Sequence, residues 1–192
     1  MKQIDVYWKA LDAIGLEHLQ LSLAASSQQA DGLVLSHEDG QALRIHYRVT
    51  ADERWNTRQV QVSPIGAAGN QIQLTSDGQG IWRDQHDQIL EQLSGCLDID
   101  IQATPFTNTL AIKRLQLEPG ASAEIDVAYV TIPQFALRRD SQRYTCLARA
   151  VDQSRYLFES LETEFKAELK VDELDLVTDY QGLWRRLDPS SR

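Results

Sequence analysis

The strongest constraint on this chain is an alternation of apolar and polar residues with a period of two. Over residues 43–50, apolar side chains alternate with arginine, histidine and threonine. That pattern is typical of a strand with one buried face and one face in water. The same alternation recurs at residues 59–62, 71–75, 97–102 and 125–129. Pairs of turn-forming residues separate the runs and predict hairpins: Asp31-Gly32, Asp39-Gly40, Gly69-Asn70, Asp77-Gly78 and Pro119-Gly120. The sequence therefore predicts a mostly β fold built as a long antiparallel sheet.

Few segments predict a helix. Thr104 followed by Pro105 is typical of a helix N-cap and first helical residue, so a short helix is expected over residues 105–110. Residues 83–93 and 160–171 carry apolar residues at spacings that fit a helix or a strand, and we interpret the second segment as a strand. No linker or repeat interrupts residues 1–192, which we predict to form a single domain.

Composition limits the classes of partner. No run approaches the roughly 18 apolar residues of a membrane-spanning helix, so stable membrane insertion is not expected. Charged residues interrupt residues 1–16, where a signal peptide would carry its apolar segment, and we predict a cytoplasmic protein. The net charge of −9 opposes binding to nucleic acid and to anionic lipid surfaces. Two isolated cysteines, Cys96 and Cys146, are expected to be buried thiols.

No catalytic residue, metal site or cofactor is assigned. Asp98 and Asp100 share one face of a predicted strand and would suit a divalent cation. The α/β scaffold that such a motif serves in sugar-nucleotide transferases is not predicted here. The preferred alternative is a polar strand face whose carboxylates accept hydrogen bonds from backbone or arginine groups. The four histidines lack metal-ligand spacing, and no GxSxG motif marks a nucleophile.

Several sequence blocks, read in order, resemble a known family. The most specific are Gly95-Cys96-Leu97-Asp98 and Thr104-Pro105-Phe106-Thr107-Asn108-Thr109. Weaker blocks include Tyr7-Trp8, Tyr47-Arg48-Val49, Asp77-Gly78-Gln79-Gly80-Ile81-Trp82 and Leu183-Trp184-Arg185-Arg186. With these blocks the chain resembles, over nearly its whole length, the putative glycolipid-binding family of bacterial proteins.

The resemblance implies a spiral β-roll, an open sheet curled around one short α-helix, assembled as a homodimer. It favours strand and turn over helix for residues 83–93. It also implies a lipid or glycolipid bound in the concave apolar interior, without catalysis. Two alternatives remain. One is a homodimeric protein-interaction module with a filled core. The other is an enzyme acting on a lipid or sugar.

The predicted ligand-binding residues lie near the junction of the predicted strand and helix. Asp98, Asp100, Thr107 and Asn108 would offer polar groups to a sugar, and Trp82 would stack on it. An alternative for Thr107 and Asn108 is that their hydrogen bonds anchor the helix under the sheet. For Trp82 the alternative is a place at the end of the β core.

Overall fold

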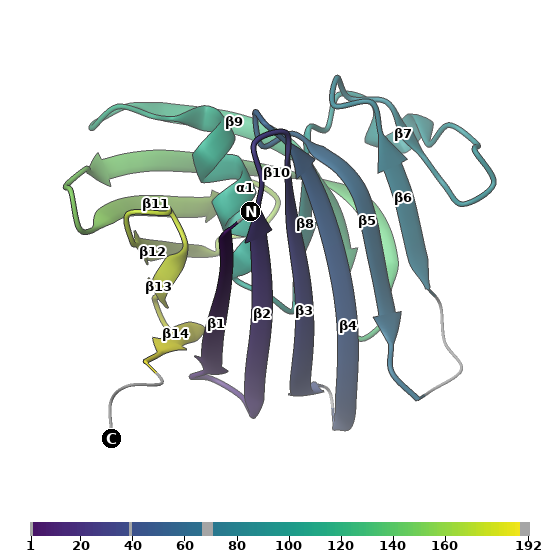
Figure 1. Cartoon of the computed structure of the whole chain (residues 1–192), viewed down its shortest axis with the longest axis horizontal. Coiled ribbons are helices and arrows are strands. Elements are labelled where there is room, and N and C mark those ends of the chain that lie inside the picture. Colours follow the sequence, from purple (N-terminus) through teal and green to yellow (C-terminus); the bar gives the residue numbers. More distant parts are fainter. Residues whose placement is uncertain (1, 39, 67–70, 189–192) are drawn as a thin grey trace.

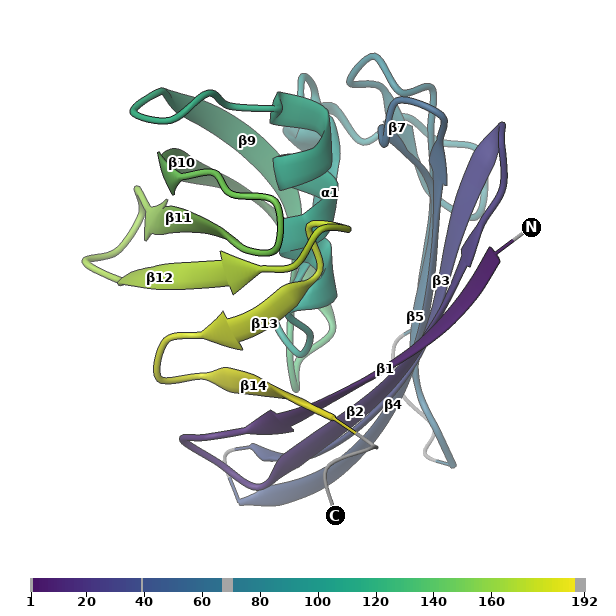
Figure 2. The same ribbon diagram turned by 60° about the vertical axis from the view of Figure 1, so that its left-hand side comes forward.

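The computed structural model describes residues 2–38, 40–66 and 71–188. These residues form one open, curled 14-stranded sheet in the order β7-β6-β5-β4-β3-β2-β1-β14-β13-β12-β11-β10-β9-β8. Figures 1 and 2 show two walls with the helix α1 between them. The first wall holds β1 (Lys2–Ala10), β2 (Gly15–Leu23), β3 (Ser27–Glu38), β4 (Gln41–Asp52), β5 (Thr57–Pro64), β6 (Ile72–Ser76) and β7 (Trp82–Arg83). The predicted mostly β fold is confirmed.

The second wall carries the C-terminal strands. It is built from β8 (Asp98–Ile101), β9 (Ser122–Thr131), β10 (Ala136–Ala148), β11 (Ser154–Ser160), β12 (Lys166–Val171), β13 (Val177–Tyr180) and β14 (Trp184–Leu187). Neighbouring strands are antiparallel except β8 and β9, which are parallel. The predicted all-antiparallel pairing is wrong at this one place, because α1 is a crossover long enough to return the chain in the same direction.

The helix α1 (Phe106–Leu115) begins one residue later than the sequence predicts and also ends later. Pro105 is its N-cap residue, and the Thr104 hydroxyl oxygen accepts a hydrogen bond from the Phe106 N–H at 3.0 Å. The predicted end at residue 110 is wrong, because the buried helix face continues through Ala111 and Ile112. Between the two walls, packing of that face outweighs weak local propensity.

Inward-facing side chains of both walls form one core around α1. On β4, Ile45, Tyr47 and Val49 are buried, while the alternate residues Arg44 and Arg48 are more exposed. The largest completely buried side chains come from both walls and from α1: Trp8, Trp82, Tyr47, Tyr144, Tyr156 and Phe106. The period-two pattern therefore placed the core face of β4 correctly, whereas on β8 the polar alternate residue Asp98 is buried as well as Ile99.

Asp31-Gly32 is not the predicted turn, since it lies in the middle of β3. Gly32 pairs with Tyr47 on β4, and a Cβ atom on Gly32 would lie 2.1 Å from the Tyr47 ring. Glycine is therefore needed here for close packing within a strand rather than for a turn.

Other predicted turns are confirmed. Gly78 lies between β6 and β7, and Gly120 lies between α1 and β9, with positive φ angles of 73° and 86°, as turns at these glycines require. Gly40, with φ of 77°, lies between β3 and β4. Asp39 and the Gly69-Asn70 pair lie outside the described residues.

The two ambiguous segments are strand and turn. Residues 83–93 contain the end of β7, an isolated bridge between Arg83 and Ile89, and a single 3₁₀ turn, η1 (Glu91–Leu93). Residues 160–171 contain the end of β11, a bend and the strand β12. Both interpretations are confirmed in outline, with η1 as the unpredicted addition.

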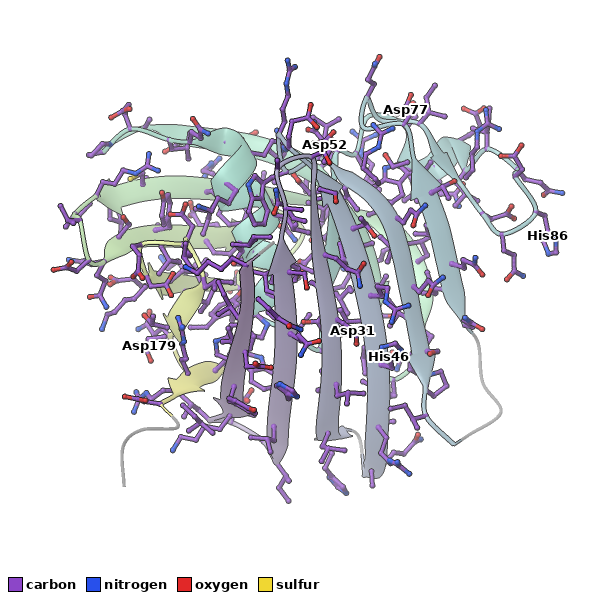
Figure 3. The ribbon with its side chains drawn as sticks, in the orientation of Figure 1. Asp31, His46, Asp52, Asp77, His86 and Asp179 are labelled. Atoms are coloured by element: carbon purple, nitrogen blue, oxygen red, sulfur yellow. The ribbon has the colours of Figure 1, made fainter. Side chains whose placement is uncertain are left out.

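The outer face of the first wall is largely polar. His46 Nε2 lies 2.9 Å from Asp31 Oδ1, and Arg48 donates to the same carboxylate. Figure 3 labels Asp31 and His46 on the adjacent strands β3 and β4. Within the described ranges, the chain forms no helix with the length and apolar character needed to span a bilayer.

Candidate functional site

A cavity of about 270 Å³ lies at the rim of the roll, where the first turn of α1 and β8 meet the second wall. We call it the rim cavity. Its polar lining consists of Asp100, Gln102, Thr104, Asn108, Arg138, Asp140, Gln142, Ser160 and Thr163. Its apolar and aromatic lining consists of Ile101, Tyr129, Phe158, Phe165, Tyr180, Leu183 and Trp184.

Three aromatic rings form one side of the rim cavity. The ring centroids of Phe158 and Phe165 lie 6.0 Å apart, and that of Tyr180 lies 6.1 Å and 6.3 Å from them. They come from β11, the bend that precedes β12, and β13, so hairpin pairing in the second wall brings them together. Such rings offer apolar faces on which the C–H face of a sugar or an acyl chain can pack.

Asp100 also lines the rim cavity. Its Oδ1 accepts a hydrogen bond from the Thr107 hydroxyl at 2.7 Å, and its Oδ2 accepts one from Gln142 Nε2 at 2.7 Å. Burial raises the pKa of Asp100, and the nearby Asp140 and Asp98 carboxylates raise it further. The two hydrogen bonds act in the opposite direction. Asp100 is thus a fixed acceptor held by α1 and β10.

Asp140 supplies a second carboxylate from β10. Arg138 Nη1 lies 2.6 Å from Asp140 Oδ1, a close ion-pair distance. This ion pair engages Oδ1 of the buried Asp140 carboxylate. The Arg138 guanidinium also stacks over the Tyr129 ring, 4.8 Å from its centroid. The arginine is therefore shared between a carboxylate and a ring.

Gln142 lies two residues further along β10 and on the same face. Its Nε2 donates to Asp100, while its buried Oε1 has no hydrogen-bond partner among the described residues. A buried acceptor without a donor costs free energy, about 1–3 kcal/mol by analogy with engineered cases. The side chain lines the cavity, while the Oε1 atom itself is enclosed.

A further buried carboxyl group lies behind Thr104. Glu17 Oε1 accepts hydrogen bonds from the Tyr47 hydroxyl at 2.5 Å and the Thr104 hydroxyl at 2.8 Å. Its Oε2 has no partner in the described part of the chain. Burial raises the pKa of Glu17 to about 8, so the group holds a proton at neutral pH.

The five predicted ligand residues do not all lie at the rim cavity. Asp100 and Asn108 line the rim cavity, and Thr107 supports it through its bond to Asp100. Asn108 accepts a hydrogen bond from the Tyr144 hydroxyl at 2.9 Å and donates to the Pro105 carbonyl, so it also anchors α1. Trp82 and Asp98 do not line the cavity.

Trp82 and Asp98 are engaged elsewhere. The completely buried Trp82 donates its indole N–H to the Cys96 carbonyl at 2.7 Å. Asp98 is buried and accepts hydrogen bonds from Arg114 Nε and Nη2. Thus the two aspartates of the predicted pair face α1 but have different partners.

Asp140 and Gln142 were missed by the sequence reasoning. On β10 the residues Asp140, Gln142 and Tyr144 alternate with exposed or half-buried polar residues, and all three are buried. The sequence pattern that indicates such residues is a strand that has polar side chains at some of its inward-facing positions and apolar side chains at the others.

A larger and shallower groove of about 510 Å³ lies beside α1 and β9. Its charged lining residues are already paired: Arg114 with Asp98, Glu124 with Arg143, and Asp126 with Arg139. The rim cavity is smaller, but it combines aromatic rings with buried polar side chains, including Gln142, whose Oε1 lacks a hydrogen-bond partner among the described residues, so we take it as the candidate site.

Together, the curled sheet, the internal helix and the rim cavity define a β-roll with a site suited to a small polar group. The family described as putative glycolipid-binding matches residues 5–186, and the chain belongs to this family. A crystal structure of a DUF1089 family protein from Pseudomonas aeruginosa is similar, with 36% sequence identity and a TM-score of 0.76. The similarity covers 90% of this chain and 92% of that one. A search of curated proteins gave no match.

Proposed function

We propose that this protein binds a glycolipid, with the sugar in the rim cavity and the acyl chain along the adjoining edge of the roll. The observation that carries the proposal is the combination, in one cavity, of aromatic rings with polar side chains that include Gln142, whose buried Oε1 has no hydrogen-bond partner among the described residues. Sugars present apolar C–H faces together with hydroxyl donors, and this lining offers a partner for each.

A second hollow, of about 150 Å³, continues from the rim cavity. Both are lined by Gln102, Leu183 and Trp184. The second also has Ala13 and Ile14 from the hairpin between β1 and β2, and Ile14 is exposed. We assign the acyl chain to this path, because apolar surface there can still be removed from water. The concave face beneath α1 is packed with side chains such as Trp8 and Leu19.

Phe165→Ala tests the sugar end of the site. Phe165 is 39% exposed, so its loss should leave the fold intact while removing one ring of the cavity. We expect the variant to bind octyl β-glucoside about tenfold more weakly than the wild type, as for a truncated aromatic contact. Isothermal titration below the micelle concentration measures the change.

The matched control is Leu147→Ala, a truncation at a similarly exposed position on β10 that lies outside the rim cavity. Its affinity should equal that of the wild type. Equal losses in the two variants, or wild-type binding in both, would contradict the assignment of the rim cavity.

A second candidate function rests on the outer face of the first wall. Leu16, Leu33 and Leu35 are exposed there, and Leu16 pairs directly with Leu35 across β2 and β3. We call these three residues the leucine patch. Contiguous exposed apolar side chains favour a protein contact, and we propose a second copy of this chain as the partner.

Leu33→Glu tests this dimer contact. Because the leucine patch meets itself in a symmetric dimer, two glutamates would be buried close together and repel. We expect sedimentation to show a dimer for the wild type and a monomer for the variant. Gln29→Glu, further along the outer face of β3, is the control for added charge and should remain dimeric. A monomeric wild type at tens of micromolar protein removes this candidate.

A further inference from the structure

We infer that the rim cavity selects sugar headgroups that donate hydrogen bonds and carry no negative charge. The inference rests on the proposed function and narrows it to neutral or amine-bearing sugars. Acidic headgroups, with a carboxylate or phosphate on the sugar, are excluded from this site.

The first reason is the balance of charge in the lining. The cavity has two carboxyl groups, on Asp100 and Asp140, and one basic side chain, Arg138, among its described lining residues. That guanidinium already pairs with Asp140 and stacks on Tyr129. An incoming anion would meet two acidic groups and a cation that is already engaged. Like charges brought together in a partly dehydrated site cost binding free energy.

The second reason is the type of hydrogen-bonding group left without a partner. Gln142 Oε1 is an acceptor, on a residue that is only 1% exposed, and it has no hydrogen-bond partner among the described residues. The amide orientation of Gln142 follows from its neighbour, since Asp100 Oδ2 needs the N–H₂ group as a donor. Hydroxyl and ammonium groups can donate to the amide and carboxylate oxygens of the cavity lining. A carboxylate or a doubly ionised phosphate can only accept.

The third reason is the aromatic wall. The faces of Phe158, Phe165 and Tyr180 carry the negative side of the ring quadrupole. Such faces attract C–H groups and cations, and they disfavour an anion placed over them.

Besides Arg138, the N-terminal turn of α1 would favour an anion, through its partial positive charge. This end of the helix is already occupied by acidic groups of the chain. Asp100 accepts from the Thr107 hydroxyl in the first turn, and Glu17 accepts from Thr104 just before it. The helix end therefore does not provide a free anion site.

A pair of ligands that differ in charge tests the inference. Octyl β-glucoside and octyl β-glucuronide share one alkyl chain and one type of ring, and the second carries a carboxylate. We expect the glucuronide to bind the wild type at least about tenfold more weakly at pH 7.5. Equal or tighter binding of the glucuronide would overturn the inference while leaving the proposed function in place. Binding of neither ligand would overturn both.

Asp140→Asn and Asp126→Asn locate the source of the selectivity. Each removes one negative charge from β9 or β10, but only Asp140 lines the rim cavity. We expect the glucoside-to-glucuronide ratio to fall several-fold towards unity in D140N and to keep its wild-type value in D126N. A ratio unchanged in a folded D140N, or reduced equally in both variants, would show that net charge or another site sets the preference. If D140N does not fold, the wild-type comparison alone decides the inference.

Discussion

Arg114→Met should lower the free energy of unfolding by about 3–5 kcal/mol, the range for removing one partner of a buried ion pair. Asp98 is 1% exposed, and its charge is compensated by the guanidinium of Arg114. The Nε and Nη2 atoms of Arg114 donate hydrogen bonds to the carboxylate at 3.1 Å and 2.6 Å. Without the guanidinium, the carboxylate stays buried with no cation. Urea unfolding followed by tryptophan fluorescence measures the loss.

Two further variants test whether that loss of stability comes from the buried ion pair. Arg114→Met combined with Asp98→Leu should recover most of the stability, because the uncompensated charge is gone. Arg143→Met removes an arginine that is 37% exposed and paired with Glu124, and should cost no more than about 1 kcal/mol. A single R114M variant as stable as R143M would show that the Asp98–Arg114 pair does not hold α1 to β8.

Glu17→Gln should change how stability depends on pH. The Glu17 pKa is about 8 in the folded protein, against an ordinary value of 4.5. Between these values the folded state binds more protons than the unfolded state, so stability must fall as pH rises. The contribution of Glu17 protonation to the free energy of unfolding is complete below pH 4.5 and lost above pH 8. Its size is of the order of 5 kcal/mol.

A glutamine side chain at this position cannot titrate, yet its oxygen can still accept hydrogen bonds from Tyr47 and Thr104. We therefore expect E17Q and the wild type to be similar in urea at pH 5, and E17Q to be clearly the more stable at pH 9. Glu53→Gln, at an exposed residue, is the control and should follow the wild type throughout. A constant difference between E17Q and the wild type from pH 5 to 9 would show that Glu17 is ionised in the fold.

The regular parts of the fold could be predicted because their cause is local. Alternation over residues 43–50 reports which face of a strand is buried, and the Thr104-Pro105 pair reports where a helix starts. The errors arose where a distant residue decides the structure. Gly32 resembles a turn residue in sequence, but it lies within a strand because Tyr47 from the next strand occupies the space above it.

The site was predicted only in part for the same reason. Asp100, Thr107 and Asn108 lie close in sequence, and local reasoning placed them near one another. Asp140 and Gln142 lie far along the chain from Asp100 and reach it only through the pairing of β8, β9 and β10. Residue type indicates what a side chain can bind, while packing decides whether it is accessible. A tryptophan suits a sugar by type, yet the ring at position 82 is completely buried.

The measurement that tests the central claim most directly is an NMR titration with octyl β-glucoside below its micelle concentration. We predict that the largest shift changes fall on the rim cavity, including the side-chain amide of Gln142 and the indole N–H of Trp184. The indole N–H of Trp82, which is bonded to the Cys96 carbonyl, should not move. Shift changes confined to the leucine patch or to the groove beside α1 and β9, with the Gln142 and Trp184 signals unmoved, would contradict a glycolipid site in the rim cavity.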